Sequence, residues 1–179
     1  NNGGATSTDE PTGVSTSVTT TADGYRWKYM YTLSAAQQAS FLSVDFMAVS
    51  PNSSPGSDQS NVISAAVDGS IDIVKIKSGG SGGTNGTHTG IAIRGDGSGG
   101  VASVTVSGGA VTAVTVTTPG SGYTFGTISN AQIVAAGATS LAGAELDVII
   151  PPKGGHGANA REELGAFFVM MNTSLEGTE

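Results

Sequence analysis

The sequence predicts a mainly β protein with two short helices, in which a β-sandwich-like core is interrupted by an inserted module of glycine-rich β-hairpin repeats. Three observations lead to this fold class. Only 12% of the 179 residues are charged and 28 are glycine, a composition that favours strands and tight turns over long helices. Short β-branched runs alternate with turn dipeptides, and one of these stretches occurs twice.

The first ordered element is expected to be a strand. Residues 1–22 are rich in Thr, Ser and Gly without a hydrophobic period, so an extended arm or a disordered terminus is expected there. From residue 25 to residue 33, aromatic side chains alternate with polar ones, which is the period of a strand with one buried face. The residues of this face that we expect in the structural core are Tyr25, Trp27, Tyr29 and Tyr31.

A short helix is expected next. Ser34 fits a helix N-cap and Gln37 stands three residues later, which is the capping-box pattern. Residues 35–42 supply good helix formers for about two turns.

A second strand and a linker complete the first part of the core, which we place at residues 23–60. Residues 45–49 are expected to form the strand, and residues 51–61 have the Pro, Ser and Asn content of a linker. Phe41 and Phe46 are expected among the buried residues of this part.

Residues 61–142 are expected to form the inserted module, with repeats near 62–100 and 101–140. Residues 71–87 align without a gap with residues 111–127. The identical pairs are Val74 with Val114, Gly80 with Gly120, Ser81 with Ser121, Gly82 with Gly122, Thr84 with Thr124, Gly86 with Gly126 and Thr87 with Thr127. We expect the two copies to pair into one small sheet or sandwich.

Each repeat is predicted to be a hairpin followed by a glycine loop. Gly69 stands in an Asp-Gly dipeptide and Gly109 in a Gly-Gly dipeptide, each between two β-branched runs. Both dipeptides suit the positive φ angles of a two-residue hairpin turn. Pro119 and Gly122 are then expected to bend the chain away from the ladder.

Residues 143–179 are expected to form the second part of the core. Residues 146–150 alternate as a strand that two prolines end, and Asn159 fits the N-cap of a short helix near 160–164. The apolar run at 166–172 is expected to be a buried strand, with a continuation of the helix as the alternative. The core residues expected here are Phe167 and Val169.

The charge balance excludes several partners. The formal net charge is −7 and only seven residues are Lys or Arg, whereas binding to a phosphate backbone needs clustered cations. The longest apolar run is far below the roughly 20 residues that span a bilayer. We therefore expect neither nucleic acid nor a membrane as a partner. No signal-peptide pattern opens the sequence and there is no initiator Met. The start at Asn1, inside NNGGATST, suggests a fragment whose upstream part is missing.

No active site is predicted. Asp96 lies in a glycine loop that lacks the context of a phosphate loop, stands without the further carboxylates of a calcium site, and closes an Arg-Gly-Asp tripeptide that we interpret as a solvated turn. His88 and His156 are the two histidines; a metal site would need carboxylates from elsewhere, so we expect structural hydrogen bonding, with tight glycine packing around His156. No nucleophile elbow or placed carboxylate pair occurs. We expect no enzyme, cofactor or small-molecule substrate.

Two stretches resemble a known family. The segment DGYRWKYMYTLSAAQQASFLSVDFMAV, residues 23–49, resembles baseplate wedge proteins of T-even-type bacteriophages, the eighth gene product family. The segment GAELDVIIPPKGGHGANAREELGAFFVMMN, residues 143–172, looks like the later part of the same family in cyanophage relatives. The unit GSGYTFGT is similar to repeats in many phage tail and baseplate proteins.

The resemblance implies a non-enzymatic structural protein of a contractile tail baseplate in the virion, assembled in the cytoplasm of a bacterial host. It also implies a homodimer that contacts other wedge proteins. The alternative is a carbohydrate-binding or adhesin module of a tail fibre, which would use exposed loop aromatics. Tyr123 and Phe125 are the candidates for such contacts, or for contacts with a partner subunit, unless they fill the core of the module. A hydrolase domain would need an acid pair that the spacing does not supply.

Overall fold

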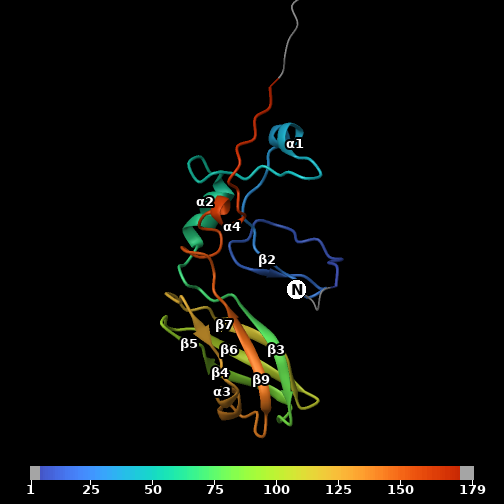
Figure 1. Cartoon of the computed structure of the whole chain (residues 1–179), viewed down its shortest axis with the longest axis vertical. Helices are drawn as coiled ribbons and strands as arrows, with labels where there is room; N and C mark the ends of the chain where they lie inside the picture. Colours follow the sequence, from blue (N-terminus) through green and yellow to red (C-terminus); the bar gives the residue numbers. More distant parts are fainter. Residues whose placement is uncertain (1–4, 174–179) are drawn as a thin grey trace, which may run out of the picture. The chain divides into compact units, whose positions relative to one another are not determined.

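The computed structural model describes residues 5–173, with 30% strand and 15% helix. The predicted mainly β class is confirmed, in the form of several small antiparallel sheets. The chain divides into two compact units (Figure 1). The terminal unit holds the chain up to Ala66 and from Gly157 onward, and the central unit is Val67–His156.

Strand structure in the terminal unit is much shorter than predicted. Strand β1, Thr19–Thr20, pairs antiparallel with β2, Arg26–Trp27, and the expected strand at 25–33 is reduced to the two residues of β2. Residues 45–49 and 166–172, both expected to be strands, belong to neither a strand nor a helix. The alternation of aromatic and polar residues predicts that a strand formed here would have one apolar face. A strand forms, however, only when a neighbouring backbone is there to pair with it.

The two predicted helices are present. Helix α1 is Ala35–Phe41, and the Ser34–Gln37 capping box is formed in both directions. Helix α4 is Ala160–Glu163, where the Asn159 side chain accepts from the backbone N–H of Glu162 at 3.4 Å. It ends at Leu164, so the alternative in which this helix runs on through the apolar segment is wrong.

A third helix of this unit, α2, Ser57–Ala65, lies where we expected a linker and the first run of a hairpin. Val62 and Gln59, three residues apart on one helix face, are both buried. The amide of Gln59 accepts from the Ser50 hydroxyl at 2.8 Å and donates to the Ser50 carbonyl at 3.3 Å. The polar member of the buried face hides the amphipathic pattern from a sequence-based assignment.

The central unit is built on two antiparallel sheets. In the first, β4, Gly86–Ala92, pairs with β6, Val101–Ser107, which pairs in turn with β7, Ala110–Thr118. In the second, β3, Ile73–Ser81, pairs with β9, Ala142–Ile149. Strand β9 therefore belongs with the repeats, which differs from the predicted boundary at residue 142. In Figure 1, β9 runs beside β3.

The two repeats contact each other reciprocally. Strands β3 and β7 are equivalent in the repeat and lie beside one another. The backbone N–H of Tyr123 donates to the carbonyl of Gly69 at 3.3 Å, and the equivalent N–H of Gly83 donates to the carbonyl of Gly109 at 2.9 Å. The turn of each copy thus supports the glycine loop of the other, an arrangement with the reciprocity of a two-fold pair. The copies therefore contact each other and are joined by the pairing of β4 with β6, but they do not form one sheet, because β3 pairs with β9 instead. The hairpin expected in the first copy is wrong, since α2 precedes its turn.

Turn geometry explains the glycines that the sequence singled out. Gly109, with φ of +80°, turns the β6–β7 hairpin as predicted. Gly69 also has a positive φ, +65°, but its turn follows a helix rather than a strand, because α2 occupies the preceding residues. A Cβ on Gly69 would lie 2.1 Å from the Tyr123 nitrogen. Gly122, with φ of +74°, donates from its N–H to the carbonyl of Asp68 at 2.8 Å.

Short elements complete the central unit. Strand β5, Arg94–Gly95, pairs with β8, Gly126–Thr127. Helix α3, Asn130–Ala135, contacts both outer strands, β4 and β9. Helix α3 was not predicted, although Ser129 and Gln132 form the same capping box as Ser34 and Gln37 and could have identified it.

The buried core lies in the central unit. Alternate residues of β6 are buried, as a strand with one face on a core requires. The largest fully buried side chains of this unit, among the residues that the structure describes, are Ile71, Val104, Val106 and Ile133.

The predicted core is not where the sequence placed it. Trp27 is 37% exposed and Phe46 is 62% exposed, while Phe167 and Val169 are almost fully exposed. The remaining predicted core residues are half-buried: Tyr25, Tyr29, Tyr31 and Phe41. The segments that carry these side chains form almost no ladder, so no second layer covers their apolar faces within residues 5–173.

Candidate functional site

An exposed apolar surface on the terminal unit is the main candidate site. We use the name apolar surface for residues 42–47 and 164–171, which contribute most of the large exposed hydrophobic side chains of the described chain. Phe168 is 90% exposed, and Val169 and Met171 are exposed to a similar degree. Contiguous exposed apolar surface of this kind marks an interaction site far more often than scattered single residues do.

Helix ends and two hydrogen bonds position the two segments of this surface. Gly165 follows α4 with φ of +67°, which redirects the chain away from the helix axis. The Asn172 side chain donates to the carbonyl of Ser40 at 2.9 Å, and so ties the end of the second segment to α1. The Tyr31 hydroxyl donates to the carbonyl of Ala48 at 2.8 Å and holds the chain beyond the first segment.

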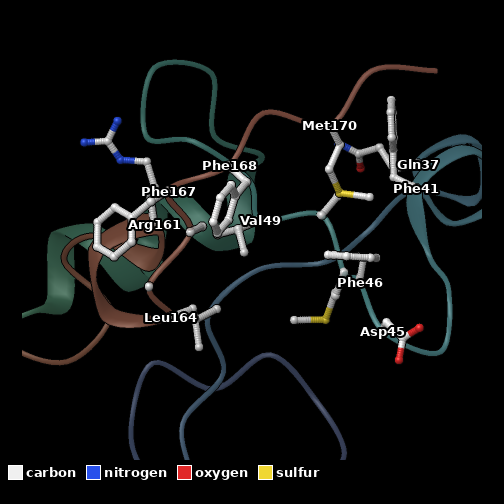
Figure 2. Close-up of a pocket in the computed structure, with 14 residues that line it drawn as sticks. Gln37, Phe41, Asp45, Phe46, Val49, Arg161, Leu164, Phe167, Phe168 and Met170 are labelled. Carbon is white, nitrogen blue, oxygen red and sulfur yellow. The ribbon is translucent and has the colours of Figure 1, made fainter. Parts of the chain in front are cut away.

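A groove of about 570 Å³ lies between the two segments (Figure 2). Phe46 lines it from the first segment, and Phe168 and Met170 line it from the second. Flexible methionine beside aromatic rings suits a surface that adapts its packing to another protein.

The groove carries little charge. Asp45 and Arg161 are its charged lining residues, and Arg161 makes a long contact of 3.9 Å with Glu162 in which both side chains are mostly exposed. An exposed pair of this kind contributes little to stability. Burial raises the pKa of Tyr31, whose hydroxyl donates to the Ala48 carbonyl.

A second candidate, the loop with Tyr123 and Phe125, divides into a buried and an exposed residue. Tyr123 is only 2% exposed; its hydroxyl donates to the carbonyl of Ile93 at 2.9 Å and accepts from the N–H of Gly100 at 3.1 Å. The expectation that Tyr123 contacts a ligand or partner is therefore wrong, and the alternative that it fills the core of the module is confirmed. Phe125 is 59% exposed and is therefore accessible to a ligand or a partner subunit.

Asp96 anchors this loop. Its carboxylate accepts from the Thr124 hydroxyl at 2.5 Å and from the backbone N–H groups of Thr124 and Phe125 at 2.9 and 3.1 Å. The Thr124 hydroxyl first, and then the two backbone groups, lower the pKa of Asp96 to about 2. Arg94, Gly95 and Asp96 are all exposed, as the interpretation of the tripeptide as a solvated turn requires. In addition, the carboxylate of Asp96 holds the loop at Thr124 and Phe125.

The two histidines stand in different surroundings. His88 Nε2 lies 2.9 Å from the Thr84 carbonyl oxygen. His156 is half-buried, and its neighbours Gly155 and Gly157 pack closely, since a Cβ on either would lie within 2.4 Å of another residue. Among residues 5–173, no three metal-ligating side chains come together. No helix in this range is long and apolar enough to cross a membrane.

Sequence reasoning found the segments of the apolar surface but assigned them the wrong environment. Phe167 and Val169 were expected inside, and Phe168 and Met171 were not singled out at all. The run AFFVMM was the feature that marked the second segment, because an uninterrupted apolar run is typical of a strand covered on both faces.

No protein-family model matches the sequence, and neither the curated proteins nor the solved structures contain a detectable match.

Proposed function

We propose that this protein is a structural wedge subunit of a contractile phage tail baseplate and acts through protein–protein contacts. The observation that carries the proposal is the apolar surface, which stays exposed in the single chain. Its side chains include Phe46, Phe167 and Phe168, which are large enough to anchor an interface. A structural subunit that acts by binding its neighbours needs an apolar interaction surface, whereas an isolated soluble domain loses solubility by exposing one.

The resemblance to wedge proteins and the apolar surface involve the same segments. Residues 23–49 and 143–172 carry the resemblance, and the apolar surface lies within these two stretches. In this proposal, the terminal unit completes a β-sandwich-like core only when a neighbouring subunit adds strands to it. The central unit is then the inserted repeat module, and its loops offer further contacts.

The proposed partners are a second copy of this chain and other wedge proteins in the virion. Nucleic acid, membrane, cofactor and small-molecule substrate have no place in the proposed role. The acidic net charge of −7 supports the first of these exclusions, since phosphate backbones repel such a surface.

The alternative, an adhesin or carbohydrate-binding module of a tail fibre, is favoured by one observation. Phe125 is exposed on a loop that Asp96 holds in place, and a rigid exposed aromatic suits stacking against a sugar ring. Tyr123 is buried, so Phe125 is the one aromatic ring of this loop that could stack against a sugar.

Immunogold labelling of purified phage tails that carry this protein tests the proposal. We expect gold particles at the baseplate, in tails with and without their fibres. Labelling restricted to fibres that is lost with them would overturn the proposal in favour of the adhesin. Absence of the chain from purified tails, judged by mass spectrometry, would overturn both.

A further inference from the structure

Residues 166–172, which overlap the second segment of the apolar surface and end at Asn172, have the properties of an unpaired strand. Phe167 to Met171 make no backbone hydrogen bond to any of the described residues 5–173. The segment is held at its two ends, where Ala166 N–H donates to the Arg161 carbonyl at 2.8 Å and Asn172 reaches Ser40. Free backbone N–H and C=O groups on an extended segment are a template for pairing with another chain.

The side chains of this segment lack cover in the single chain. Phe167, Phe168 and Val169 are all exposed, so successive residues on both faces of the segment lack cover. Strands with apolar residues on both faces are buried in folded sheets, so this segment favours contact with another apolar surface. Another copy of the same segment supplies both the missing backbone partner and apolar side chains.

Charge and area both fit a second copy. Residues 166–172 contain no charged side chain, so two chains of net charge −7 can meet there without opposing like charges. A buried aromatic side chain covers roughly 150–250 Å², so Phe46, Phe167 and Phe168 would together remove on the order of 400 Å² per copy from water. Val169, Met171 and the exposed side chains of residues 42–47 bring the total toward the roughly 800 Å² per partner of a standard interface.

We propose that residues 166–172 of one chain pair antiparallel with the same residues of a second copy, about a two-fold axis at Val169. Antiparallel pairing is the arrangement that a two-fold axis imposes on two identical strands within one sheet. The paired segments then cover the phenylalanine and methionine side chains of each other's apolar surface. This inference rests on the self-association proposed above and names the segment that carries it.

Cysteine cross-linking tests the proposed register, because the chain has no cysteine and a single introduced thiol can be cross-linked only between chains. At the axis, the Cα atoms of opposed residues lie about 4.5–5.5 Å apart, within disulfide range. Two residues from the axis, identical positions are about 13 Å apart along the strands. Under a mild oxidant we expect Val169→Cys to form a covalent dimer at least tenfold faster than Phe167→Cys or Met171→Cys. Ser107→Cys, on an exposed hairpin, is the control for random collision.

Light scattering coupled to size exclusion separates this inference from the broader proposal. We expect the unmodified chain to be a dimer, Phe168→Asp to be a monomer with an unchanged circular dichroism spectrum, and Phe125→Asp to remain a dimer. A dimer whose cross-linking is uniform across residues 167–171, or no faster than for Ser107→Cys, overturns the pairing but leaves self-association in place. A monomer at every concentration overturns both, while the immunogold result still decides the baseplate assignment.

Discussion

Gly69 and Tyr123 join the two repeats through their backbones. The Tyr123 N–H donates to the Gly69 carbonyl at 3.3 Å, and a Cβ on Gly69 would lie 2.1 Å from the same nitrogen. The equivalent pair, Gly109 and Gly83, makes the same hydrogen bond at 2.9 Å. The duplicated sequence therefore produces one folded unit in which each copy completes the other.

Replacing Gly69 by Ala should destabilise the central unit strongly. Left-handed backbone geometry costs a non-glycine residue about 1–2 kcal/mol, and the clash with the Tyr123 backbone should add about 1–3 kcal/mol. Gly108→Ala is the matched control, because Gly108 has a similar φ of +63° and open space around it. Urea unfolding followed by far-ultraviolet circular dichroism should show the larger loss for Gly69→Ala. Equal losses would contradict the reciprocal contact.

Tyr123→Phe should cost about 1–3 kcal/mol of unfolding free energy. The ring stays, but the Ile93 carbonyl and the Gly100 N–H lose their partner in a buried place. Tyr123→Ala should cost about 3–5 kcal/mol, as for other large core aromatics. Phe125→Ala, two residues away and exposed, should change stability by less than about 0.5 kcal/mol. The same urea titration measures all three, and a neutral Tyr123→Phe would contradict the hydrogen bonding described for the hydroxyl.

Asp96→Asn should weaken the loop in a pH-dependent way. The folded pKa of about 2 lies below the ordinary value near 3.9. The carboxylate therefore contributes stability that is fully present above about pH 4 and is lost as the pH falls through about 2. We expect the urea midpoints of the two proteins to differ at pH 6 and to converge toward pH 2. A difference that is constant with pH would mean that charge on Asp96 plays no part.

The position of the core predicts opposite results for two large hydrophobic residues. Ile133→Ala should cost about 2–5 kcal/mol, because Ile133 is fully buried in the central unit. Trp27→Ala should leave the unfolding of that unit unchanged, since Trp27 belongs to the terminal unit and is partly exposed. Hydrogen exchange of the central-unit amides reports the difference, and loss of their protection in Trp27→Ala would contradict the separation into two units.

Local chemistry made several elements predictable. The Ser34 capping box and the Asn159 cap each act within three residues, so the starts of α1 and α4 could be placed from the sequence. The β6–β7 hairpin followed from its Gly-Gly turn, and the alternation near Val148 predicted β9. Helix α2 was not predicted, because a polar residue, Gln59, lies on its buried face. The hydrogen bond that makes this burial possible comes from Ser50, which lies outside the helix.

The sequence by itself determined the mainly β class, the duplication of a turn, a strand and a glycine loop, and the absence of cysteine, because composition and short-range spacing are sufficient for these properties. Only the tertiary structure decided that Tyr123 is buried while Phe125 is exposed, and that residues 167–171 are exposed. An apolar pattern shows that a side chain gains by leaving water. Which backbone comes to cover that side chain depends on contacts between distant residues, and these form only when the whole chain folds or meets its partner.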